Sequence, residues 1–205
     1  LRPEAEDTSD RGSSAAAVGV NHKLVDEMMA ACCGSKNLIF SNTRQNVEVY
    51  ADALNERCRA EGRPPEFLVH HGSLSKEVRE QTEELMRGSR PATTVCSSSL
   101  ELGIDIGSVK SVGQIGAPWS VSSLVQRLGR SGRREGEPSI MRVYIAIDRP
   151  DSRSGLVDRL YPDLLQAIAL TELMLQKWIE PPEIHGLDLS TCMQQVLSVL
   201  AETGG

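Results

Sequence analysis

Aromatic residues are scarce in this sequence, and their scarcity limits what the protein can bind. Phenylalanine, tryptophan and tyrosine make up only 3% of the 205 residues, which argues against rows of aromatic side chains that stack on the bases of a single strand. The formal net charge of −6 argues equally against a histone-like basic protein. Any contact with nucleic acid must therefore be confined to a local surface.

Regular cysteine patterns and long apolar runs are also missing. The five cysteines are odd in number and never form a CxxC pair, so the sequence indicates neither a disulfide framework nor a zinc knuckle. A reducing cytoplasm fits this usage best. No apolar run approaches the roughly 20 residues of a membrane helix, and we expect neither a signal peptide nor a membrane partner. Because the chain begins at Leu1 rather than methionine and stops at Gly205, we expect a piece of a longer protein.

The most distinctive stretch that is present is QRLGRSGRR, at residues 126–134. A guanidinium group fits phosphate oxygens with paired hydrogen bonds, and glycine lets a backbone approach a ligand closely. A solvated helix face is the alternative, but its two glycines would cost such a helix roughly 1 kcal/mol each. We therefore interpret the stretch as a phosphate-binding element, with four arginines around its two glycines: Arg127, Arg130, Arg133 and Arg134.

Helix and strand patterns alternate from residue 22 to residue 146. The spacing of apolar residues predicts helices at 22–33, 47–58, 76–87 and 120–128. Compact apolar runs predict strands at 37–40, 67–70, 93–96, 112–115 and 141–146, with a turn or short helix at 97–103. This alternation predicts an α/β fold, in which helices cover both faces of a parallel sheet.

Polar motifs follow the predicted strands. SNTRQ, HGSLS, SSSLELGIDIG and, beyond Gly116-Ala117-Pro118, QRLGRSGRR each lie at the carboxyl end of a strand. Ligands of parallel sheets gather at that edge. The shared position indicates a site more strongly than any single motif does.

Three smaller features each allow two interpretations. Ser97–Ser99 offer hydroxyls that commonly hold phosphate and Asp105 could accept from a ribose, whereas the serines could also cap a helix. His70 and His71 are adjacent in a strand and face opposite ways, so we predict no metal site. Trp119 could stack on a base, but packing is the ordinary role of a lone tryptophan and is the role we predict.

The motifs together resemble a known family. LIFSNTRQ (38–45), HHGSLS with Arg79 (70–79), TTVCSSSLELGIDIG (93–107) and QRLGRSGRR (126–134) resemble, in this order, the second RecA-like domain of superfamily 2 helicases. Within that superfamily, residues 22–150 look most similar to the large helicase-related (Lhr) group of ATP-dependent DNA helicases.

Composition, helical pattern and the resemblance together predict a domain plan. Residues 1–19 read as a linker or mobile segment, and 20–150 as the RecA-like domain. Residues 151–186 read as a helical connector, with helix from 156 to 178 interrupted at Pro162. Residues 187–205, with a helix at 191–201, fit the truncated start of a winged-helix domain.

The resemblance also implies that ATP with Mg²⁺ binds between two RecA-like domains. Neither GxxxxGK[ST] nor a DExH-type acidic motif occurs in the sequence, which implies that the first domain is absent and that this fragment alone is inactive. Arg130 and Arg133 match the catalytic arginines that reach the γ-phosphate. The matched cofactor-binding positions are Gly103, Asp105, Gln126 and Arg127, and none is a metal ligand.

Nucleic-acid contacts are implied as well. The matched positions are Asn42, Thr43, Arg44, Gly72, Ser73, Ser97 and Ser98. The expected partners are DNA, as a single strand or duplex end, together with the first RecA-like domain and the winged-helix domain of the same parent chain. An RNA helicase module and a catalytically silent interaction domain remain the alternatives.

Overall fold

A five-stranded parallel sheet forms the centre of the protein. A computed structural model describes residues 20–101, 106–132, 136–147, 149–151, 154–181 and 189–203. The strand order is β2-β3-β1-β4-β5, and each neighbouring pair is parallel. The predicted α/β fold is confirmed, although the last strand ends two residues earlier than predicted. The strands are β1 (Asn37–Ser41), β2 (Phe67–His70), β3 (Thr93–Cys96), β4 (Ser111–Ile115) and β5 (Met141–Tyr144).

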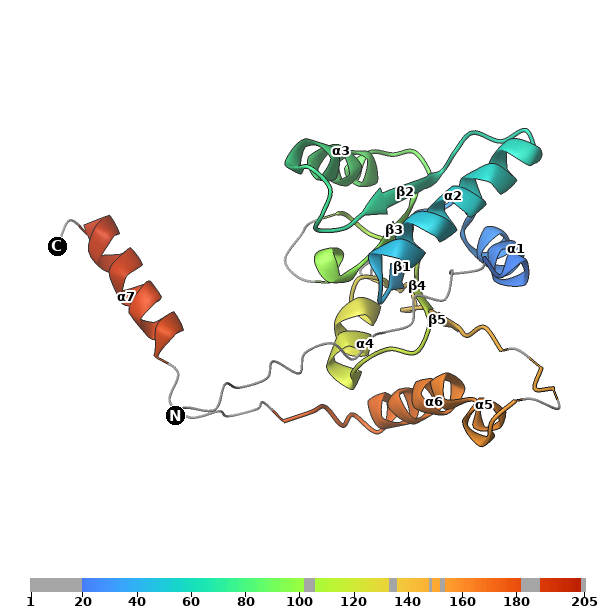
Figure 1. Cartoon of the computed structure of the whole chain (residues 1–205). Helices are drawn as coiled ribbons and strands as arrows, with labels where there is room; N and C mark the ends of the chain where they lie inside the picture. Colours follow the sequence, from blue (N-terminus) through green and yellow to red (C-terminus); the bar gives the residue numbers. More distant parts are fainter. Residues whose placement is uncertain are drawn as a thin grey trace, which may run out of the picture.

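Helices cover both faces of the sheet (Figure 1). On one face, α1 (His22–Cys32) and α2 (Arg44–Ala60) pack with Ile39 in one apolar cluster. On the other face, α3 (Lys76–Arg87) contributes Met86 to a second cluster with Leu38 and Phe40. Because β1 has helices on both sides, all five of its residues are buried. This is why the strand reads as a continuous apolar run rather than an alternating one.

Side-chain caps fix the point at which the helices after β1, β2 and β4 begin. Thr43 accepts a hydrogen bond from Asn46 N at the start of α2 (3.2 Å), and Ser75 accepts one from Val78 N at the start of α3 (3.4 Å). Ser120 does the same for α4 (Val121–Leu128). Since capping satisfies backbone N–H groups that have no partner in the helix, these residues define the turns at the carboxyl edge of the sheet.

The C-terminal part of the chain is helical. The helix predicted over 156–178 is broken into α5 (Leu156–Leu160) and α6 (Pro162–Leu175), because Tyr161 adopts a left-handed conformation (φ 48°) before the proline. The last predicted helix falls within α7 (Ser190–Thr203). Over the part of the chain that the structure describes, no helix is both long and apolar enough to cross a membrane.

Helix α6 lies beside α4 (Figure 1). Gln166 Nε2 on α6 donates to the carbonyl oxygen of Pro118 (2.8 Å), in the loop before α4. The carboxylate of Glu180 accepts hydrogen bonds from Val121 N (2.6 Å) and Ser122 N (3.0 Å). Burial opposes ionisation of Glu180, but the hydrogen bonds to its carboxylate outweigh burial and lower its pKa. The C-terminal segment therefore holds the first turn of α4 in place.

Candidate functional site

The motifs predicted to follow β1 and β2 meet at the carboxyl edge of the sheet. The guanidinium group of Arg44 hydrogen-bonds the hydroxyl of Ser73, and both residues are exposed. Thr43 and Gly72 are also exposed, although the hydroxyl of Thr43 is engaged in capping α2. The edge therefore presents a cation, a hydroxyl and accessible backbone, which is the chemistry that holds a phosphate.

The serines after β3 lie next to β2. Ser97 N donates to the carbonyl oxygen of His70 (3.2 Å), and Ser98 is exposed at the start of the 3-10 helix η1 (Ser98–Leu100). Ser97 precedes η1 but makes no side-chain capping bond, so helix capping does not explain this hydroxyl. Ser99 hydrogen-bonds the Nδ1 atom of His70 (2.8 Å).

The two adjacent histidines have separate partners. Nε2 of His70 lies 3.3 Å from Glu83, whereas Nε2 of His71 lies 3.0 Å from Glu48. Burial lowers the pKa of His70, although Glu83 acts in the opposite direction. Among the residues described, no three His, Cys, Asp or Glu side chains are close enough to share a metal ion.

Arg127 lies in the protein interior, with only 4% of its surface exposed. Its Nη2 atom is 3.0 Å from Oε2 of Glu101, its Nη1 atom donates to Gln114, and its guanidinium carbon lies 4.9 Å from the ring centre of Phe40. The other carboxylate oxygen of Glu101 accepts from the hydroxyl of Ser123 (2.6 Å). Arg127 therefore connects α4 to β4 and to the turn after η1.

Arg130 is anchored to the same turn. Its Nη2 atom donates to the carbonyl oxygen of Glu101 (2.7 Å), and the side chain is partly buried. Gln126 is exposed on α4. Three other predicted site residues, Gly103, Asp105 and Arg133, lie outside the described residues.

Gly132 is required by the packing of the chain itself. Its φ of 65° lies in the left-handed region, and an added Cβ atom would come within 2.6 Å of Ser139 N. The adjacent Ser131 pairs with Val109 in an isolated parallel bridge, and its hydroxyl accepts from Ile140 N (3.1 Å). The lack of a side chain at Gly132 therefore lets the segment that leads into β5 pack closely against it.

Glu101 and Gln114 were not identified from the sequence, although each carries a signal. Gln114 is a long polar side chain within a fully buried strand, and Glu101 follows the buried Leu100. The amide of Gln114 also reaches Oδ1 of Asn42 (3.3 Å), and Asn42 Nδ2 donates to the carbonyl oxygen of Ala117 (2.7 Å). Buried polar residues of this kind need partners, which the sequence does not reveal.

The prediction that Trp119 packs inside the protein is wrong. The residue is 73% exposed, in the loop between β4 and α4. The backbone of this loop is fixed by the hydrogen bond from Gln166 on α6 to the carbonyl oxygen of Pro118. The ring of Trp119 remains at the surface.

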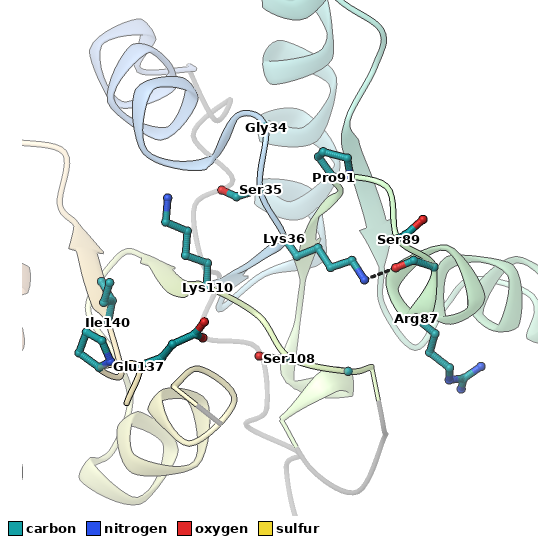
Figure 2. A pocket seen from close by; sticks show the side chains of 13 residues that line it. Gly34, Ser35, Lys36, Arg87, Ser89, Pro91, Ser108, Lys110, Glu137 and Ile140 are labelled. Atoms are coloured by element: carbon teal, nitrogen blue, oxygen red, sulfur yellow. Dashed lines mark hydrogen bonds between the residues drawn. The ribbon is translucent and has the colours of Figure 1, made fainter. Parts of the chain in front are cut away.

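A large hollow lies at the opposite edge of the sheet. It has a volume of about 810 Å³ and is lined by the segments that lead into β1, β3, β4 and β5. Figure 2 shows the amine of Lys36 directed at the end of α3, where it donates to the carbonyl oxygens of Met86 (2.7 Å) and Gly88. None of the predicted site residues that the structure describes lines this hollow.

The five-stranded parallel sheet with helices on both faces is a RecA-like α/β fold. Residues 19–135 match the family described as "Helicase conserved C-terminal domain". Because the match covers more than half of the chain, the protein belongs to this family, whose members include the C-terminal domains of superfamily 2 helicases.

Individual relatives point to the Lhr group. The chain is 40% identical to an "ATP-dependent helicase Lhr-Core" of Methanothermobacter thermautotrophicus over 114 residues, which is 56% of this chain and 13% of that protein. It is also 40% identical to the Lhr-Core helicase of Sulfolobus acidocaldarius over 136 residues, covering 65% of this chain and 15% of the relative. The sequence therefore spans less than a sixth of these helicases.

A solved structure agrees with this assignment. The helicase Lhr of Mycobacterium smegmatis bound to ssDNA and AMP-PNP matches 88% of this chain and 22% of its own chain, with a TM-score of 0.66 and 32% identity. The predicted resemblance to superfamily 2 helicases, and to the Lhr group in particular, is confirmed.

Proposed function

We propose that this chain is the second RecA-like domain of an ATP-dependent DNA helicase or translocase. In this role it supplies Arg130 and Arg133 to the γ-phosphate of an ATP molecule held by the first RecA-like domain. Asp105 and Gly103 contact the ribose side of the nucleotide, with Gln126 and Arg127 in support. Residues 151–186 then connect to a winged-helix domain that begins near residue 187.

The observation that carries this proposal is the attachment of Arg130 to the carbonyl oxygen of Glu101 at the carboxyl edge of the sheet. A side chain held by the backbone loses less freedom when it meets a phosphate, so it is suited to act on a bound nucleotide. Charge spreads over the equatorial oxygens in the transition state of γ-phosphoryl transfer, and a fixed guanidinium group stabilises this charge more than it stabilises bound ATP.

The residues present fit part of an ATP site. Arginine suits the γ-phosphate, but the sequence contains neither a phosphate loop nor a DExH-type acidic motif for Mg²⁺. The β-phosphate and the metal ion are therefore assigned to the other domain, and the isolated chain should not hydrolyse ATP. When bound, the nucleotide supplies the phosphoryl group, while this chain contributes charge and position.

The surface around Arg44 and Ser73 is the proposed path for a nucleic-acid strand, with Ser97, Ser98 and the backbone of Gly72 beside it. Groups of this kind hold phosphates and do not read bases, so binding should be independent of sequence. The ssDNA in the M. smegmatis Lhr structure supports DNA as the partner. A measured preference for RNA over DNA of the same sequence would replace this part of the proposal.

The test is Arg130→Ala in a full-length helicase that contains this domain. An arginine that acts on the γ-phosphate is worth about 10³–10⁵ in rate, so kcat should fall by that factor. The affinity for ATP, measured in a separate titration, should change little. Lys110→Ala is the matched control, because Lys110 is an exposed cation in the hollow at the opposite edge. A near-normal kcat for Arg130→Ala, or an equal loss for Lys110→Ala, would contradict the proposal.

A further inference from the structure

We infer that Glu101 is a positioning residue for ATP hydrolysis, which sets the location of Arg130 through a buried ion pair with Arg127. The inference rests on the role proposed for Arg130 and adds a residue to it. Glu101 itself is 7% exposed and is not available to a nucleotide or a nucleic-acid strand at the surface.

Glu101 contacts both α4 and Arg130, which follows the end of that helix. Its carboxylate binds Arg127 (3.0 Å) and Ser123 (2.6 Å) on α4, while its backbone carbonyl accepts from Arg130 (2.7 Å). Between the two arginines, Arg130 N donates to the carbonyl oxygen of Arg127 (3.0 Å). One residue therefore fixes the helix end, the turn after it and the arginine side chain.

The Glu101–Arg127 pair is built for geometry rather than for stability. Both side chains are almost fully buried, with exposures of 9% and 5%. Desolvation opposes such pairs, and apolar residues of similar volume often stabilise a fold equally well. What a carboxylate and a guanidinium group add is direction, because the planar guanidinium group donates its hydrogen bonds only at fixed angles. Gln114 and the ring of Phe40 restrict the guanidinium group further.

Small displacements at this position should be costly. A reacting group moved by about 1 Å can lose about 10²-fold in rate. Glu101→Gln keeps the size of the side chain but removes its charge and places an amide N–H₂ group opposite a donor. The guanidinium group of Arg127 then loses part of its support, and Arg130 moves with the end of α4.

The experiment is a double-mutant cycle of Glu101→Gln and Arg130→Ala in the full-length helicase. We expect Glu101→Gln alone to lower kcat by about 10- to 100-fold. The affinities for AMP-PNP and for a single strand should be unchanged. In the Arg130→Ala background, Glu101→Gln should cause no further loss, because it acts through that arginine. A purely structural role predicts losses that multiply, and multiplying losses would overturn the inference.

A second variant controls for a loss of kcat that is caused by misfolding. Glu101→Gln alone leaves a buried cation without its counter-ion, whereas Glu101→Gln with Arg127→Gln removes both charges. We expect the double variant to fold, as judged by circular dichroism, and still to show the reduced kcat. A folded double variant with normal kcat would also overturn the inference.

The cycle separates this inference from the function on which it rests. If Arg130→Ala keeps a near-normal kcat, the proposed function fails. If Arg130→Ala is strongly impaired while folded Glu101→Gln is normal, the proposed function stands and the role of Glu101 is wrong.

Discussion

The two edges of the sheet differ in which polar groups are buried and which are exposed. At the carboxyl edge, Arg127 and Glu101 are buried together, while Arg44 and Ser73 remain exposed. At the amino edge a hollow of about 810 Å³ opens between loops, but the amine of Lys36 is already bonded to backbone carbonyls (Figure 2). This hollow therefore lies apart from the described motif residues of the carboxyl edge. An open edge is what a domain needs if a second domain completes its site.

The largest expected contrast between the edges concerns stability. Arg127→Met leaves the carboxylate of Glu101 buried without its partner, and breaking a buried pair in this way costs about 3–5 kcal/mol. Arg87→Met removes the analogous pair with Glu83, where the arginine side chain is 51% exposed. A pair of that kind contributes about 0–1 kcal/mol. Urea unfolding of the two variants measures both free energies, and equal losses would remove the distinction between the edges.

The next contrast concerns nucleic acid. Arg44→Ala at the carboxyl edge should weaken single-strand binding for every sequence, because it removes a phosphate contact. The slope of log affinity against log salt should become shallower by about 0.7, the value of one contact on a single strand. Lys110→Ala at the amino edge should leave the affinity and the slope unchanged. Titrations of labelled strands at several salt concentrations measure both quantities, and an equal effect of the two variants would place the strand elsewhere.

The smallest contrast is a dependence of stability on pH at the carboxyl end of β2. Burial lowers the pKa of His70 in the folded protein, so the unfolded chain takes up a proton first as the pH falls below about 6.5. Stability should then decrease from about pH 6.5 down to the folded pKa. His70→Asn should flatten this part of the curve of Tm against pH. His22→Asn, at an exposed position, controls for loss of a histidine. A curve that His70→Asn leaves unchanged would show that this imidazole does not set the dependence.

Much of the fold could be predicted because local patterns decide it. Burial on both faces explains why β1 is the continuous run NLIFS. Burial of one helix face explains the spacing of Val47, Leu54 and Cys58 in α2. The break at Pro162 was visible, but the left-handed Tyr161 that ends α5 was not. Helix and strand ends depend on single backbone angles, which composition does not determine.

The candidate site was predictable only in part. Glycine and arginine in residues 126–134 indicated phosphate chemistry, and the structure places Arg130 at the expected edge. The partner of Arg127 could not be found from spacing, because Glu101 is 26 residues away and meets it only once β4 and α4 are packed. Contacts between distant segments arise from the fold, and a single sequence does not encode them as a visible pattern.

The position of β1 has a consequence for the synthesis of the chain. The strand is made first but lies at the centre of the sheet, and its neighbours β3 and β4 begin 56 and 74 residues later. At about 5–20 residues per second, a ribosome needs about 4–15 s to add the second of these partners. During this interval Leu38, Ile39 and Phe40 have no completed sheet to join. A nascent chain that stalls before residue 111 would expose an apolar strand with an open edge, which is the kind of segment that chaperones protect.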